Sequence, residues 1–239
     1  VMPEDTPFVK VAATRGHGAT VVLAGETLAE SQVEAERIRA ERDLVLIHPY
    51  DDADVIRGQG TIALELLADA PDLEVLVVPV GGGGLVSGIA IAAKALRPDI
   101  RIVGVECALY PSMWAALRGE TARCGGSTLA EGIAVKNPGR LTREAVRAHV
   151  DDIVLVDEPA IERAVNAYLT LQKTMAEGAG AAGLAAILTA PERFAGARVG
   201  LVLCGGNIDP RILASIMVRE LAREKRIVSI RVIIQDRPG

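Results

Sequence analysis

The sequence predicts an α/β protein whose mostly parallel sheet is covered by helices on both faces. Short runs rich in β-branched residues alternate along the 239 residues with Ala- and Glu-rich windows of helical period. This alternation is typical of parallel strands joined by helical crossovers. Two of the runs, "VLVVPV" and "VGLVLC", are apolar at nearly every position, as expected for strands that are buried on both faces. Aromatic residues make up only 3% of the chain, so the core is expected to be aliphatic.

The expected elements follow one another in a regular order. The β-branched runs predict strands over residues 20–23, 44–47, 74–79, 101–106, 153–156 and 198–203. The windows of helical period predict helices over residues 27–42, 59–69, 85–96, 142–149, 158–175, 179–188 and 210–224. Pro159 and Pro210 suit the first turn of a helix, and each closely follows an aspartate that can cap it.

Two changes in composition divide the chain. The stretch "IHPYDDADVIRGQG", residues 47–60, is polar and rich in turn residues, and we interpret it as a crossing between two lobes. The last stretch, "RIVSIRVIIQDRPG", alternates apolar and polar residues, so a half-exposed strand of a different domain is expected to begin near Lys225. The apolar start at "VMPEDTP" and the end just after a strand-like run predict a fragment of a longer protein.

Charge, hydropathy and cysteine content argue against several classes of protein. The net charge is −5, and no basic tract indicates nucleic-acid binding. No apolar run reaches the roughly 18–20 residues that span a bilayer, and no signal or lipidation motif is present. Cys107, Cys124 and Cys204 are odd in number and lack CxxC spacing, so the cytoplasm is the expected compartment.

Four consecutive glycines, Gly81, Gly82, Gly83 and Gly84, separate a predicted buried strand from a helix that starts at Leu85. The N–H groups at a helix N-terminus are unpaired and carry partial positive charge, and glycines before them let these groups wrap an anion. We interpret the loop as a phosphate cradle. The alternative is a tight strand-to-helix turn, which needs only one or two glycines.

Two other phosphate-binding motifs fit this loop less well. The pattern GxxxxGK[ST] is absent, because apolar residues stand where Lys and Ser/Thr belong, and this argues against a P-loop hydrolase. A dinucleotide fingerprint would use Gly81, Gly83 and an out-of-register Gly88, with Glu106 as the acid that binds the ribose. A nicotinamide site therefore stays open as the weaker alternative.

A second glycine turn favours a small ligand at this edge of the sheet. The stretch "VGLVLCGGNIDP" again passes from a buried strand through Cys204, Gly205 and Gly206 to a helix. Two such turns at one sheet edge could hold opposite ends of one molecule. Between them, in "TMAEGAGAAGLAA", Glu177 precedes an Ala-rich helix. Taken alone, it could equally be a partner of the helix dipole.

Together, "VPVGGGGLVSGIA", "TLAEGIAV", "TMAEGAGAAG" and "LVLCGGNID" resemble the threonine/serine dehydratase group of fold-type II pyridoxal-phosphate enzymes. The stretches "VMPEDTPFVKVAATRGHGATVVL" and "VIRGQGTIALEL" fit the same group, so the resemblance covers nearly the whole chain. It implies the tryptophan synthase β-like fold of two lobes. Residues 1–48 would be a remnant of the smaller lobe, 49–224 the large cofactor-binding lobe, and 225–239 the start of an ACT-like regulatory domain.

The resemblance also implies which residues contact pyridoxal 5'-phosphate. The glycine loop would bind the phosphate through backbone N–H groups. Cys204 would lie by the pyridine nitrogen, Glu177 near the ring and Gly132 along the ring edge. The residues expected to bind the cofactor are Gly81, Gly82, Gly83, Gly84, Leu85, Gly132, Glu177, Cys204 and Gly205.

Two features of the family are missing. Members carry a Schiff-base lysine in a motif like S-F-K-x-R-G-A and a downstream S-x-G-N-H loop, and none of the five lysines has this context. No catalytic residue is therefore expected in this chain, which should be inactive alone. Some relatives bind a divalent cation through a glutamate that Glu106 matches and an aspartate six residues later, where Ser112 stands. No metal is therefore expected.

The activity that the resemblance implies is threonine dehydratase, the β-elimination of threonine to 2-oxobutanoate and ammonia. Serine dehydratase and serine racemase are alternatives within the family. A non-catalytic ligand sensor and a nicotinamide-dependent oxidoreductase are alternatives outside it. The ACT-like tail favours a threonine dehydratase of isoleucine biosynthesis that a branched-chain amino acid controls, and a homo-oligomer is expected.

Overall fold

The chain forms two compact units, Val1–His48 and Pro49–Gly239. The computed structural model describes residues 1–6, 8–228 and 230. The ACT-like segment expected at residues 225–239 falls mostly on 229 and 231–239, which lie outside the described residues.

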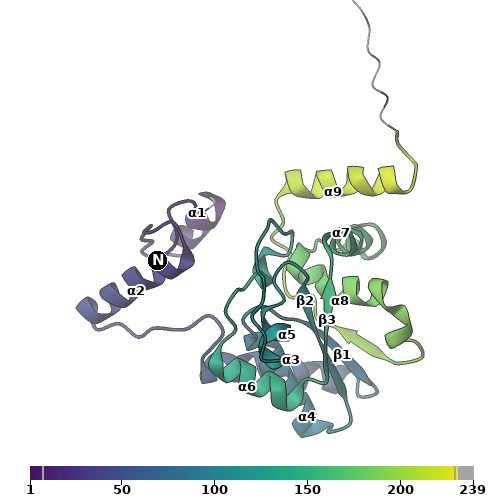
Figure 1. Ribbon diagram of the computed structural model, residues 1–239, viewed down its shortest axis with the longest axis horizontal. Helices are drawn as coiled ribbons and strands as arrows, with labels where there is room; N and C mark the ends of the chain where they lie inside the picture. The colour runs from purple at the N-terminus through teal and green to yellow at the C-terminus, as the bar shows by residue number, and fades with distance from the viewer. Residues whose placement is uncertain (7, 229, 231–239) are drawn as a thin grey trace, which may run out of the picture. The chain divides into compact units, whose positions relative to one another are not determined.

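A parallel sheet forms the centre of the second unit (Figure 1). Its described strands run in the order β3-β2-β1-β4, and every neighbouring pair is parallel. All residues of β1 are buried, which confirms the prediction of a strand covered on both faces. The same prediction is wrong for β4, whose residues are only half-buried because it lies at the edge of the described sheet. The strands are β1 (Val75–Pro79), β2 (Arg101–Cys107), β3 (Asp152–Val156) and β4 (Val199–Leu201).

The helices of the second unit mostly occupy the predicted windows. The helix expected over residues 158–175 ends early, and a wider turn follows it. No helix among the described residues is long and apolar enough to cross a membrane. The elements are α3 (Ala53–Asp69), α4 (Gly84–Leu96), α5 (Ser112–Leu117), η1 (Glu131–Ile133), α6 (Arg140–His149), α7 (Glu158–Ala167), η2 (Tyr168–Gln172), α8 (Gly178–Thr189), η3 (Pro191–Arg193) and α9 (Pro210–Arg223).

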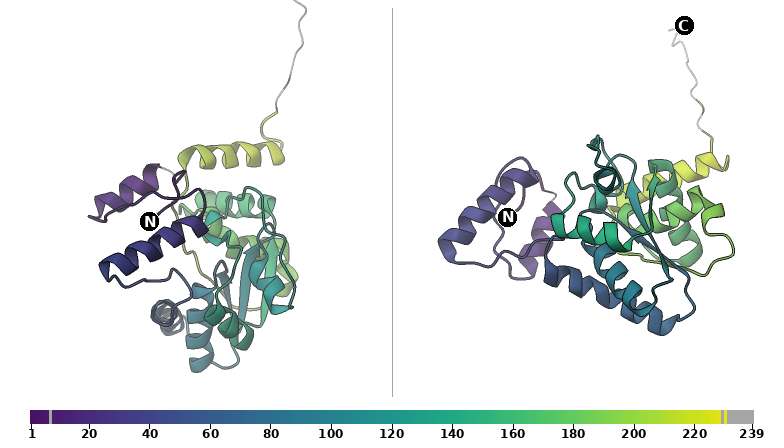
Figure 2. Two further views of the ribbon diagram at one scale, coloured as in Figure 1. Left: turned by 60° about the vertical axis from the view of Figure 1, so that its left-hand side comes forward. Right: turned by 60° about the horizontal axis from the view of Figure 1, so that its bottom comes forward.

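These helices cover both faces of the sheet (Figures 1 and 2). Side chains along a strand alternate between the two faces. Leu76 and Val78 of β1 therefore pack in one aliphatic core with α3 and α4. Val75 and Val77 pack in a second core with α7 and α8. The predicted α/β architecture with helices on both faces is confirmed.

Helix α3 begins earlier than the sequence indicates. The sequence predicts a turn-rich crossing over residues 47–60, but the structure has a helix that starts at Ala53. Asp52 caps this helix by accepting hydrogen bonds from the N–H groups of Asp54 and Val55 at 2.8 and 3.1 Å. Of the two glycines in this stretch, Gly60 serves close packing, because a methyl group there would lie 3.1 Å from the carbonyl oxygen of Gly88. A methyl group at Gly88 of α4 would lie 2.2 Å from the carbonyl oxygen of Ile56.

The first unit contains α1 (Phe8–Gly16) and α2 (Leu28–Arg42). The prediction of strands over residues 20–23 and 44–47 is wrong. Leu23 forms only an isolated bridge with Met2. Residues 44–47 pair with no strand in the described chain. A strand is stable only when a neighbour completes its backbone hydrogen bonds. As a result, Val45 and Ile47 remain 89% and 76% exposed.

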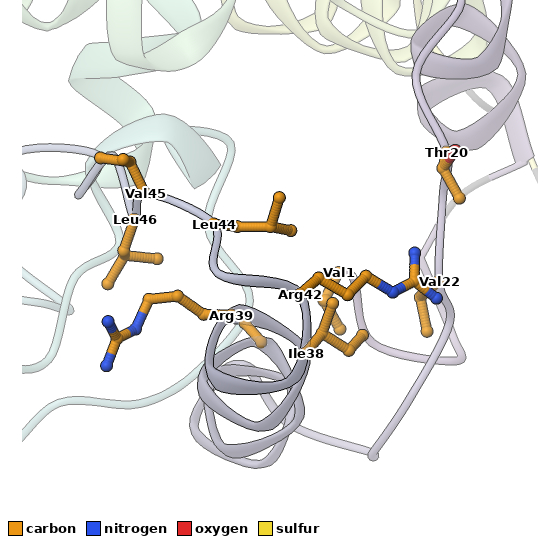
Figure 3. Close-up of a pocket in the computed structure, with 10 residues that line it drawn as sticks. Val1, Thr20, Val22, Ile38, Arg39, Arg42, Leu44, Val45 and Leu46 are labelled. Carbon is orange, nitrogen blue, oxygen red and sulfur yellow. The ribbon is translucent and has the colours of Figure 1, made fainter.

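A hollow of about 230 Å³ lies within the first unit (Figure 3). Val22, Ile38 of α2 and Leu44 line it together with other residues of the unit. None of the residues that the sequence assigns to a site is among its lining. The residues assigned to a site all lie in the second unit.

Candidate functional site

The four glycines connect β1 to α4, and the last of them, Gly84, is the first residue of that helix. Gly83 is the N-terminal cap of α4, and its φ of 97° lies in the left-handed region that favours glycine. A helix N-terminus normally uses a Ser, Thr, Asp or Asn side chain to satisfy its first N–H groups. At α4, no side chain of the described residues does so.

The backbone N–H groups of this loop lack acceptors among the described residues. Within the described part of the chain, no carbonyl or side chain accepts a hydrogen bond from the N–H groups of residues 81–85. Gly82, Gly83 and Gly84 are buried, and Gly81 and Leu85 are half-buried. Buried N–H groups are rarely left unpaired in proteins. Together with the positive end of the α4 dipole, they form a site that fits an anion.

The protein packs closely behind these glycines. A methyl group at Gly82 would lie 2.2 Å from the ring of Tyr50. A methyl group at Gly83 would lie 2.7 Å from Cε of Met113 and 2.8 Å from Cβ of Thr142. Any side chain in the loop would therefore displace the residues that hold it.

Glu177 lies beside the second glycine turn, and Gly132 lies close to both Glu177 and the first turn. It is the N-terminal cap of α8, and its N–H donates to the carbonyl of Gly205 at 3.1 Å. Methyl groups at Gly205 and Gly132 would lie 2.3 and 3.6 Å from Oε1 of Glu177. A methyl group at Gly81 would lie 3.3 Å from the carbonyl oxygen of Gly132. The structure thus brings these four predicted residues together beyond the carboxyl ends of β1 and β4.

Cys204 directly precedes this glycine turn and is accessible. Partial desolvation raises the pKa of its thiol, and the negative charge of Glu177 raises it further. The thiol therefore stays neutral at neutral pH. A neutral sulfur beside a carboxylate is a weak hydrogen-bonding group and carries no charge into the site.

Three residues that sequence reasoning missed support the glycine loop. Tyr50 covers Gly82, and its hydroxyl donates to the carbonyl of Asn137 at 3.0 Å. Burial raises the pKa of Tyr50, and the charge of Asp51 adds to this effect. Asp51 caps α6, and Thr142 of α6 donates its hydroxyl to the loop. The one signal in the sequence is the pair of aspartates in "PYDD", since only one of them is needed to cap α3.

Glu106 lies fully buried at the carboxyl end of β2. Its carboxylate accepts hydrogen bonds from the N–H groups of Met113 and Trp114 at the start of α5, both at 2.8 Å. Burial raises its pKa to about 7, although these N–H groups lower it. The Ser112 hydroxyl donates to the carbonyl of Val135 at 2.6 Å. The described residues contain no group of three or more His, Cys, Asp or Glu side chains that could hold a metal ion.

Glu158 of α7 holds the segment that leads to Gly132. Its carboxylate accepts hydrogen bonds from the hydroxyl of Thr128 at 2.5 Å and from the N–H of Leu129 at 2.9 Å. The thiol of Cys107 lies 3.4 Å from the same carboxylate. Gly132 follows in η1, so its position depends on contacts that start from α7.

Comparison with known proteins places the chain in one family. Residues 1–205 match the family model described as "Pyridoxal-phosphate dependent enzyme". An L-threonine ammonia-lyase of Thermotoga maritima is 45% identical over 241 residues, which cover all of this chain. The chain spans only 60% of the length of that relative.

Solved structures are also similar to this chain. The processed form of threonine deaminase isoform 2 from Solanum lycopersicum is 32% identical, with a TM-score of 0.85 over 93% of this chain and 62% of that one. Serine racemase from Dictyostelium discoideum is 35% identical, with a TM-score of 0.79 over 87% of this chain and 67% of that one.

Proposed function

This chain belongs to the family of pyridoxal-phosphate dependent enzymes, and on that premise we propose that it is part of a threonine ammonia-lyase. The reaction converts threonine to 2-oxobutanoate and ammonia by β-elimination. The observation that carries this proposal is the set of unpaired N–H groups in the glycine loop at the carboxyl end of β1. The 45% identity to an L-threonine ammonia-lyase supports the choice of reaction.

The glycine loop fits the phosphate group of the cofactor. The N–H groups of Gly81, Gly82, Gly83, Gly84 and Leu85 would donate to its oxygens. The partial positive charge of α4 would favour its negative charge. Since the backbone supplies these donors, no basic side chain is needed in the cradle.

The second turn fits the aromatic ring. Gly132, Glu177, Cys204 and Gly205 would lie around it, because Gly132 and Gly205 both lie close to Glu177 and Cys204 directly precedes Gly205. Bound pyridoxal phosphate supplies an electron sink for the bonds at the α-carbon of an amino acid. The neutral Cys204 thiol would leave the ring nitrogen without the proton that a carboxylate would hold there. This arrangement suits an elimination more than reactions that need a fully protonated ring.

We propose that the chain by itself does not turn over threonine. None of its five lysines stands in the context of the family's Schiff-base lysine. Lys94 of α4, for example, forms an ion pair with Asp151 at 2.9 Å. The residue that removes the substrate's α-proton is therefore not assigned to this chain.

Serine racemase is the second candidate, favoured by the similarity to the Dictyostelium enzyme. The glycine loop and Glu177 do not discriminate between the two reactions, because both need the same cofactor. Control by a branched-chain amino acid, a role in isoleucine biosynthesis, a cytoplasmic location and a homo-oligomeric state are further proposals that rest on the sequence resemblance.

The test uses the full-length protein that contains this chain. It should purify with bound pyridoxal phosphate, seen as a chromophore. It should also release 2-oxobutanoate from threonine, because the elimination depends on this cofactor. Epimerised serine without a keto acid would instead support the racemase. A protein that binds no pyridoxal phosphate when it is supplied would contradict both.

A further inference from the structure

The carbonyl of Gly82 is tied to helix α6. Oγ1 of Thr142 donates a hydrogen bond to this carbonyl oxygen at 2.7 Å, across 60 residues of sequence. The N–H of Gly139 approaches the same oxygen at 3.4 Å. Thr142 and Gly82 are both buried, so water does not compete for this contact.

The direction of this carbonyl determines the direction of the next N–H group. The carbonyl of Gly82 and the N–H of Gly83 belong to one planar trans peptide and point in opposite directions. When Thr142 holds the carbonyl towards α6, the N–H of Gly83 must point away from α6. Glycines on both sides of this peptide would otherwise allow it to rotate with little steric cost.

Thr142 is itself held by its neighbours. Its N–H donates to Oδ1 of Asp51 at 3.1 Å, and the hydroxyl of Ser87 donates to its carbonyl at 3.3 Å. Asp51 also accepts the N–H of Arg140 at 2.9 Å, so it caps α6 in place of Gly139. A methyl group at Gly139 would lie 2.2 Å from Oδ1 of Asp51, so a larger residue would displace this cap.

We propose that Thr142 is a positioning residue that orients the peptide between Gly82 and Gly83, so that the N–H of Gly83 faces the cofactor phosphate. This inference rests on the proposed function of the glycine loop. It assigns Thr142 no contact with the substrate or with the cofactor. Its hydroxyl acts on the phosphate only through the Gly82 carbonyl.

The experiment measures the binding of two ligands to cofactor-free full-length protein. The ligands are pyridoxal phosphate and pyridoxal, which lacks the phosphate. Thr142→Val keeps the shape of the side chain and removes the hydroxyl, whereas Thr142→Ser keeps the hydroxyl. The melting temperature of each cofactor-free variant monitors folding.

Thr142→Val should raise the dissociation constant of pyridoxal phosphate by about tenfold, because one oriented donor to the anion is lost. The affinity for pyridoxal should stay unchanged, which a general loss of structure would not allow. Thr142→Ser should bind both ligands like the parent protein. If Thr142→Val does not fold, Thr142→Ala carries the same expectation, since it places no methyl group against the carbonyl.

Two results would overturn the inference in distinguishable ways. If Thr142→Val binds pyridoxal phosphate like the parent, or loses affinity for both ligands equally, Thr142 does not orient the cradle. If the parent protein itself binds pyridoxal phosphate no better than pyridoxal, the glycine loop does not bind a phosphate, and the proposed function fails with it.

Discussion

At Gly83 the backbone has a conformation that few side chains allow, and the space beside it is filled. The φ of 97° is left-handed, and a methyl group would overlap Met113 and Thr142. We therefore expect Gly83→Ala to lower the free energy of unfolding of the cofactor-free protein by about 1–3 kcal/mol. Denaturant unfolding monitored by circular dichroism measures this change.

Gly58→Ala is the matched control for this substitution. Gly58 lies exposed inside α3, and a methyl group there would meet nothing within 4 Å. Replacing a helical glycine by alanine should raise stability by about 0.5–1 kcal/mol. If both substitutions change the free energy of unfolding in the same direction, the claim that close packing around Gly83 excludes a side chain is contradicted.

The charge of Glu177 acts on Cys204, and alkylation can measure this effect. A raised pKa keeps the thiol neutral to higher pH, and only the thiolate reacts with iodoacetamide. Glu177→Gln removes the negative charge, lowers the thiol pKa and should therefore speed alkylation of Cys204 at pH 8. The difference should vanish at a pH well above the thiol pKa of both proteins.

Cys124 provides an internal control in the same peptide map. Its pKa is raised by burial and by Glu106, and Lys136 opposes the shift, so Glu177 has no part in it. Its alkylation rate should be the same in both proteins. An unchanged alkylation rate at Cys204 would contradict the claim that the charge of Glu177 raises the pKa of this thiol.

The sequence predicts those residues of the site that are adjacent in the chain. A run of glycines between an apolar run and a helical window indicates an anion cradle. In the described part of the chain, the N–H groups there have no acceptor. The sequence does not indicate Thr142 or Asp51 as site residues. Thr142 contacts the glycine loop across 60 residues of sequence, and Asp51 contacts α6 across 91. Such contacts depend on how helices pack, which a local pattern does not encode.

At the scale of elements, α7 positions the segment that carries η1. Glu158→Ala leaves the hydroxyl of Thr128 and the N–H of Leu129 without their acceptor. The loss of these bonds should cost about 1–3 kcal/mol of local stability. Amide hydrogen exchange should therefore become faster in residues 128–133 and stay unchanged in α3.

An exposed glutamate provides the control for this variant. Glu144 of α6 pairs only with Arg140 in the contacts described, and both side chains are more than half exposed. Glu144→Ala should leave the exchange in residues 128–133 as it is in the parent protein. Equal exchange in the Glu158 and Glu144 variants would contradict the role of Glu158.

The elements that sequence reasoning missed have physical reasons. Apolar content alone predicted strands at residues 20–23 and 44–47, but strands need neighbours, and the described part of the first unit offers only one isolated bridge. The sequence does not predict the first turns of α3, because the glycines at 58 and 60 weaken its helical pattern. Gly60 is nonetheless needed there, because the backbones of α3 and α4 meet beside Gly88.

At the scale of the whole molecule, α9 links the site to the segment after it. Arg219 of α9 pairs with the buried Glu162 of α7 at 2.7 Å, and Arg223 pairs with the same carboxylate. Removing residues after 225 should leave these contacts intact. If the tail opens a regulatory domain, this truncation of the full-length protein should abolish the response to a branched-chain amino acid and keep the basal rate. Loss of both together would contradict a separate regulatory part.

The central claim is that the backbone of the glycine loop binds the cofactor phosphate. A crystal structure of the full-length protein with bound pyridoxal phosphate tests it most directly. Phosphate oxygens should lie about 2.7–3.2 Å from the backbone nitrogens of residues 81–85, at hydrogen-bonding distance. A phosphate held elsewhere, with the loop N–H groups bonded to protein atoms, would contradict the claim.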